Sequence, residues 1–354
     1  MTLRPLLTAL LAACVGGTAL AQSSVDRAVL GTTAPLTEPQ KAALEGFASK
    51  HVDTIKDGND AEKVEEARAA LVSPARDPAA SPTFRKAYAV MLIGEFGATL
   101  KGRDVRRAIN AMQVLRFTRT QEGLDVIIER SAPASETEAS KRIAAAGLAI
   151  DAFEDLDAGN AYFETAARRL KEAAVAETDP IAMQQKLAAI AAAARRKDLP
   201  PENARAVRKQ MIDGIAAIAK SIRGSSKADL RVMALQRALI GVRNDLLEMS
   251  GAERTAVSKV LAPALADLIA AAGAQWASAH DQPALSQSYG SLLNSCEVLL
   301  RLIDRSERAA AYSGAKSEGD ARILTPAWES KDKTKFDAEA KKWSDIVGAA
   351  PYKV

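Results

Sequence analysis

The residues of this chain that could do chemistry are few, and they lie far apart in the sequence. There are two histidines, His51 and His280, and two cysteines, Cys14 and Cys296. Metal sites and nucleophile systems usually need histidine in the company of further ligands or of an orienting carboxylate. His51 has no partner at helical spacing that would complete a metal-binding face. We therefore expect no metal site and no cofactor.

One histidine has a carboxylate beside it, in the pair His280-Asp281. A carboxylate can orient the imidazole of a general base, but at a predicted helix break the pair is more simply interpreted as a helix cap. The sequence contains no GxGxxG, GxxxxGK[ST], HExxH, CxxC or GxSxG motif. We expect a protein without catalysis of its own; the alternative is an extracytoplasmic enzyme with an atypical site near His280 and Asp281.

Basic residues gather in two stretches of the sequence. Residues 195–237 carry eleven Lys and Arg against four Asp and Glu, and residues 101–119 carry six against one. If corresponding helices of a stack line one face, these charges form a basic groove for an acidic protein or an anionic polymer of the envelope. Nucleic acid is not expected, because aromatic residues are not interleaved with the cations. The residues predicted to line this basic face are Arg106, Arg107, Arg195, Arg196, Lys197, Arg205, Arg208, Lys209 and Arg231. The alternative is an ordinary solvated surface.

The first 21 residues have the layout of a secretory signal peptide. Arg4 precedes an apolar run over residues 6–15, and a small-x-small pattern ends at Ala21. Cleavage after Ala21 would export the chain to the periplasm or the medium. Leu-Ala-Ala-Cys, ending at Cys14, also resembles a lipobox, so the alternative is a structural envelope protein anchored by a lipid on Cys14. No later segment has the ~20 mostly apolar residues that a membrane span needs, and none is expected in the mature chain.

The rest of the chain is patterned for helices. Aromatic residues make up 4% of the sequence, and much of its apolar content is alanine, which favours helices packed in thin layers. Apolar residues recur at helical spacing, as in the stripe Val207, Met211, Ile215, Ile218 and Ile222. Helix starts are predicted at Ser81-Pro82 and Asp179-Pro180 and at capping boxes that begin with Thr37, Ser135 and Ser250.

The helical patterns recur with a period. Helix starts near Arg106, Arg142, Gln185 and Arg231 are 36, 43 and 46 residues apart. The segments 104–131 and 141–173 each resemble one unit of a HEAT or armadillo-type repeat, whose period lies in this range. We therefore predict an all-α, α-solenoid-like stack of antiparallel helix pairs, with roughly 12–14 helices. A less regular helical bundle is the alternative.

Four segments follow from these patterns. Residues 1–21 are the signal peptide, 22–36 a flexible leader, 37–308 the helical-repeat domain, and 309–354 a linker with a C-terminal docking helix. In that helix Phe336 and Trp343 are seven residues apart, and we expect them to pack on the last repeat; the alternative is an exposed anchor for a partner. Cys296 lies on an apolar stripe and is predicted to be buried and inert. The expected function is that of an exported binding or scaffold protein.

Overall fold

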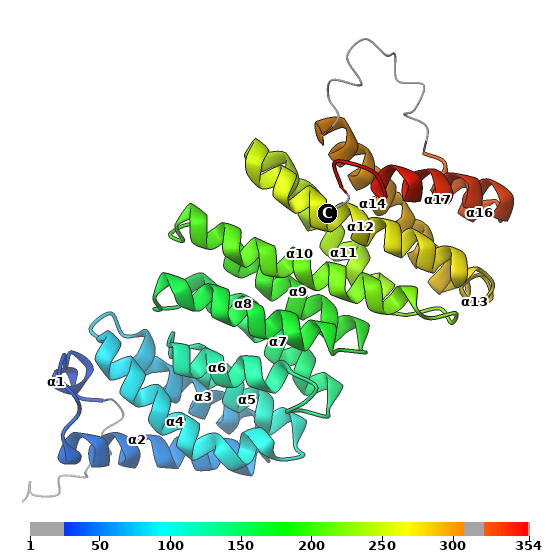
Figure 1. Ribbon diagram of the computed structural model, residues 1–354. Coiled ribbons are helices and arrows are strands. Elements are labelled where there is room, and N and C mark those ends of the chain that lie inside the picture. The colour runs from blue at the N-terminus through cyan, green and yellow to red at the C-terminus, as the bar shows by residue number, and fades with distance from the viewer. Residues whose placement is uncertain (1–24, 308–321, 353–354) are drawn as a thin grey trace, which may run out of the picture.

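The computed structural model describes residues 25–307 and 322–352. Within these ranges the chain forms sixteen helices and no strand, stacked into an elongated array with the N-terminal helices at one end and the C-terminal helices at the other (Figure 1). The predicted all-α stack is therefore confirmed. Thirteen of the helices have eleven or more residues, in line with the expected number, and the three short helices were not predicted.

In chain order the helices are α1 (Arg27–Leu30), α2 (Glu38–Asp57), α3 (Ala61–Arg76), α4 (Pro82–Lys101), α5 (Val105–Arg116), α6 (Gln121–Ser131), α7 (Ala139–Asp155), α8 (Asn160–Val175), α9 (Pro180–Ala194), α10 (Pro201–Arg223), α11 (Val232–Glu248), α12 (Gly251–Ala274), α13 (Trp276–His280), α14 (Pro283–Glu307), α16 (Leu324–Glu329) and α17 (Lys333–Val347).

Helix starts are set by local side-chain caps. Ser81 and Asp179 accept hydrogen bonds from the first-turn amides of α4 and α9, each followed by proline at the first helical position. Thr37 forms the predicted capping box with Gln40. The capping box predicted to begin at Ser135 is wrong, because the N-cap of α7 is Glu138. The backbone amide of Glu138 donates to the Glu136 carboxylate.

The long helices form two layers. The first layer stacks α3, α5, α7, α9, α11 and α14 side by side, and the second stacks α2, α4, α6, α8, α10, α12 and α17. From α2 to α14 the consecutive long helices alternate between the layers, so each pair is antiparallel and helices within a layer run parallel. The last helix, α17, runs antiparallel to α12, because Phe336 near its start lies against Gly273 at the end of α12. The segments 104–131 and 141–173 are the pairs α5/α6 and α7/α8. The core is the thin seam between the layers, where small residues such as Ala145, Ala149 and Ala166 are fully buried.

The two ends of the described chain pack on this stack. In the segment expected to be a flexible leader, Leu30 and Leu36 are buried, and Ser81 donates its backbone amide to the Leu30 carbonyl at 2.8 Å. At the other end α17 packs on α12, with Phe336 and Trp343 in the core. The signal peptide at residues 1–21 and the lipobox at Cys14 lie outside the described residues.

One helix of the described part, α12, is long and apolar enough by length and composition to cross a membrane. About half of its apolar window is buried against the rest of the stack, where α12 contacts α10, α14 and α17. On its more open side Asp267 pairs with Arg223 of α10 at 2.5 Å. Packing between three neighbours accounts for the apolar character of this helix.

A charged cluster is buried between α7, the α8–α9 connection and α9. The Glu177 carboxylate accepts two hydrogen bonds of 2.8 Å from the Arg142 guanidinium and one of 2.6 Å from the Lys186 ammonium. It also accepts the backbone amides of Thr178 and Asp179 at 3.0 Å. Glu177 and Lys186 have no exposed surface. The cluster joins two successive helix pairs through a set of groups that are satisfied only together.

Candidate functional site

The structure does not bring the nine predicted basic residues onto one face. Arg106, Arg107 and Arg231 lie at the N-terminal ends of first-layer helices. The other six lie along the opposite edge of the stack, where the first-layer helices end, in the α9–α10 connection and the first turns of α10. Because helices within a layer run parallel, these two groups are separated by the length of a helix. They belong to different surfaces of the molecule.

Six of these side chains already have partners, some of them on neighbouring helices and some within the same helix or its cap. Arg196 donates to the Leu156 carbonyl at 2.6 Å and lies 4.9 Å from the ring centre of Phe163. Arg208 donates to Glu253 of α12 at 2.7 and 3.0 Å. The other paired members are Arg107 with Asp104, Arg195 with Asp245, Lys209 with Asp213, and Arg231 with Asp229. Part of the basic character of residues 195–237 therefore serves contacts between neighbouring helix pairs.

Three of the nine are exposed and have no ion-pair partner within the described residues: Arg106, Lys197 and Arg205. They lie on three different helices or connections. Arg205 borders a hollow of about 420 Å³ between α10 and α12, together with Arg208 and Lys209. Three isolated cations do not make a continuous binding surface for a polyanion.

His280 lies in a wall of aromatic rings, and its two ring nitrogens face carbonyl oxygens. Nδ1 is 2.9 Å from the Trp276 carbonyl and Nε2 is 3.1 Å from the Trp328 carbonyl. Its ring stacks on Trp328 at a centroid distance of 4.2 Å. Asp281 is the exposed C-cap of α13 and is not among the hydrogen-bond partners of His280. This arrangement holds α13 against α16 and leaves no free nitrogen for proton transfer.

No metal-binding group is found in the described part of the chain, where no three His, Cys, Asp or Glu side chains converge suitably. Cys296 is fully buried, and burial raises the pKa of its thiol above the ordinary value. A thiol in apolar surroundings is a poor nucleophile, since the thiolate is the reactive form.

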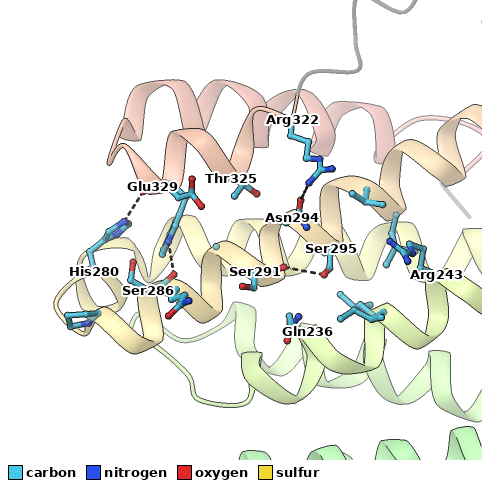
Figure 2. A pocket seen from close by; sticks show the side chains of 18 of the residues that line it. Gln236, Arg243, His280, Ser286, Ser291, Asn294, Ser295, Arg322, Thr325 and Glu329 are labelled. Atoms are coloured by element: carbon cyan, nitrogen blue, oxygen red, sulfur yellow. Dashed lines mark hydrogen bonds between the residues drawn. The ribbon is translucent and has the colours of Figure 1, made fainter.

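A groove of about 910 Å³ lies in the C-terminal third of the stack, between α11, α14 and α16. It is larger than the hollow between α10 and α12 and than that of about 660 Å³ between α2 and α4. Figure 2 shows α14 as the floor, with side chains of α11 on one side and of α16 on the other. We define the groove by the exposed faces of these three helices. It is the candidate functional site.

The floor of the groove is a row of small polar side chains on α14. Ser286, Ser291, Asn294 and Ser295 follow one another at helical spacing along it. Their hydroxyl and amide groups are short, so a partner can approach the α14 backbone closely and still find hydrogen bonds. Buried Leu292, Cys296 and Leu299 hold the other side of α14 in the core.

From α11 the groove is lined by Gln236, Leu239, Ile240 and Arg243, and the exposed apolar residues Met233 and Leu247 lie before and after this lining on the same helix. Ile240 lines the groove with 45% of its surface accessible, and Met233 and Leu247 on the same face are 44% and 61% exposed. The predicted stripe of this helix, which includes Leu235 and Leu239, is buried, with Leu239 at the bottom edge of the groove. An apolar row left in water by a helix that already has a buried face is typical of a surface that contacts a partner.

Two guanidinium groups lie at the end of the groove nearer the C-terminus of α11, beside the middle of α14. Arg322 donates to the Asn294 amide oxygen at 2.6 Å (Figure 2). Arg243 is exposed, and its hydrogen-bond contact is the Asn244 side chain at 3.5 Å. Neither pairs with a carboxylate within the described residues. At the other end Glu329 and Lys331 lie near His280, so the charge there is balanced.

The other end of the groove is held rigid by the aromatic cluster. Trp328 is 1% exposed, stacks on Tyr289 at 5.5 Å between ring centres, and donates its indole N–H to the Ser286 carbonyl at 2.9 Å. Trp276 packs edge-on against it at 4.8 Å. The ring of Trp328 therefore offers an edge but no open face, so the groove lacks the stacking platform that a sugar or a nucleobase would need.

Sequence reasoning did not identify this groove. One signal was present: Met233, Ile240 and Leu247 recur every seven residues outside the stripe assigned to the core. The contribution of α16 carried no such signal, because this short helix lies more than 70 residues from α11 in the sequence.

Comparisons of the chain with protein-family models, with curated proteins and with solved structures found no match. The interpretation of the groove therefore depends on its own geometry and chemistry.

Proposed function

We propose that this chain is an exported, non-catalytic binding or scaffold protein of the HEAT/armadillo type, which holds a partner in the groove between α11, α14 and α16. The observation that carries the proposal is the exposed apolar row of Met233, Ile240 and Leu247 beside a groove of about 910 Å³. Stacked helix pairs commonly present such extended surfaces to partners.

The chemistry of the groove supports binding over catalysis. Its polar groups are hydroxyls, amides and guanidinium groups, which orient a ligand by hydrogen bonding. His280 contributes packing, with both ring nitrogens against carbonyl oxygens. The regular alternation of helices between two layers supports the HEAT/armadillo assignment.

Export is supported by the signal-peptide layout of residues 1–21. The intact mass of the protein recovered from its producing cells tests this part of the proposal. A chain that starts at Gln22 agrees with secretion, whereas a diacylated chain that starts at Cys14 replaces it with a lipid-anchored envelope protein.

Site-specific photocrosslinking tests the binding proposal. The photoreactive amino acid p-benzoylphenylalanine is placed at Ile240 in the groove or, as a control, at Arg168 on α8, which is likewise exposed. We expect irradiation of cells to give a discrete protein adduct at position 240 and none at position 168. No adduct at either position, or equal adducts at both, contradicts the proposal.

A further inference from the structure

The exposed apolar row of α11 has the spacing of a helix–helix seam. Met233, Ile240 and Leu247 are seven residues apart, which is the repeat of coiled-coil contacts. At a rise of about 1.5 Å per residue, the row extends over about 21 Å. A partner helix of about four turns would cover it from end to end.

The backbone around the groove favours a helical partner over an extended one. Strand addition needs an exposed sheet edge with unpaired amides and carbonyls. The groove is walled by helices α11, α14 and α16, whose backbone groups bond within each helix. A ligand can therefore use only side chains, and a helix presents side chains with its own backbone already satisfied. The short side chains of Ser291 and Ser295 leave room for that close approach.

Two arginines of the groove, Arg243 and Arg322, indicate that the partner surface is negatively charged. On the neighbouring helices some arginines are matched by acids, as Arg208 is by Glu253 and Arg223 by Asp267, whereas the exposed Arg205 is not. Arg243 and Arg322 face the same end of the groove without a carboxylate from the described residues. Because both guanidinium groups line the same groove, a partner that brings carboxylates to this end could pair with the two of them together.

We infer that the groove binds an amphipathic, acidic α-helix of a partner protein, with its apolar seam on Met233, Ile240 and Leu247 and its carboxylates on Arg243 and Arg322. This inference rests on the proposed function and adds the class of partner. The apolar seam supplies contact area, and the two arginines set register and exclude basic helices.

Binding of two matched synthetic helices tests the inference. The first is a fluorescein-labelled peptide of about 18 residues with leucine at its heptad seam and glutamate at the flanking positions; in the second, lysine replaces glutamate. Fluorescence anisotropy measures both against the purified protein. We expect the glutamate peptide to bind at least about tenfold more tightly, with affinity that falls as salt rises from about 50 to about 300 mM.

Variants of exposed residues locate the binding. Arg243→Glu should weaken the glutamate peptide by about tenfold or more and strengthen the lysine peptide, because the charge at the groove end is reversed. Ile240→Asp should weaken both peptides, since it places a carboxylate in the apolar seam. Arg205→Glu is the matched control: it makes the same change at another exposed arginine, on α10, and should change neither affinity.

The outcomes separate this inference from the proposed function. Absent binding of the glutamate peptide, equal binding of both peptides, or equal effects of Arg243→Glu and Arg205→Glu would overturn the acidic-helix inference. If the crosslink at position 240 nevertheless persists, the groove remains a binding site for a partner of different chemistry. If that crosslink is absent as well, both proposals fail.

Discussion

Replacing Glu177 with glutamine should destabilise the fold far more than its small change in shape suggests. The substitution exchanges Oε2, which accepts from Arg142 and Lys186 at 2.8 and 2.6 Å, for an amide N–H₂. Two buried cations then face a donor and each other. Removing one partner of a buried ionic group typically costs about 3–5 kcal/mol in the free energy of unfolding. We expect Glu177→Gln to lie in this range, because Lys186 has no exposed surface through which water could compensate.

Urea denaturation followed by circular dichroism at 222 nm measures this difference. Glu172→Gln on α8 is the matched control, since Glu172 is exposed and pairs with Arg168 one turn away; its expected cost is below about 0.5 kcal/mol. Adding Lys186→Met to Glu177→Gln should restore part of the stability, because one unpaired charge is removed. Equal stability of the Glu177→Gln and Glu172→Gln proteins would refute the reasoning that this cluster holds two repeats together.

The same residue predicts a dependence on pH. Burial opposes ionisation of Glu177, but hydrogen bonds from Arg142 and Lys186 outweigh it and lower its pKa from the ordinary 4.5 to about 2. A folded-state pKa below the unfolded value gives stability that is present above pH 4.5 and is lost as pH falls towards 2. The difference between wild-type and Glu177→Gln should therefore be constant near neutral pH and shrink between these values. A difference that grows on acidification would contradict the assignment.

Two further predictions test the core. Leu292→Ala on α14 should cost about 2–5 kcal/mol, because Leu292 is fully buried, whereas Leu247→Ala on α11 should cost less than about 0.5 kcal/mol at 61% exposure; equal urea midpoints would show that the groove side of α11 is covered in the free protein. In a Cys14→Ser chain, Cys296 should not react with Ellman's reagent at pH 8 until urea unfolds the protein, because its thiol is buried and its pKa raised; rapid reaction of the native protein would contradict this.

Local patterns in the sequence predicted the helices well. The stripe from Val207 to Ile222 is buried along α10, and Ser81 and Asp179 cap the helices that they were predicted to begin. These features depend on contacts within a few residues, which a sequence displays directly. The prediction at Ser135 was wrong because several nearby polar side chains can accept hydrogen bonds at the start of a helix, and here the Glu136 carboxylate accepts the backbone amide of Glu138.

The candidate site was harder to predict, because residues of the same type serve different purposes. Arg208 and Arg243 are both arginines on amphipathic helices, yet Arg208 is tied to Glu253, 45 positions away, and Arg243 faces the groove. The prediction of a basic face assumed that every such arginine was free to bind a partner. Only the position of the neighbouring repeat decides which guanidinium is paired and which is available.

The sequence by itself determined that this chain folds into stacked helices and where several of them begin. Apolar periodicity and capping hydrogen bonds depend on residues within one or two helical turns of each other. The tertiary structure decided which charges bridge repeats and where α16 lies beside α11 and α14. Those outcomes depend on side chains brought together from segments 35 to 92 residues apart, such as Arg142 with Glu177 and Gln236 with Trp328. A groove formed by such distant segments leaves no local pattern in the sequence from which it could be predicted.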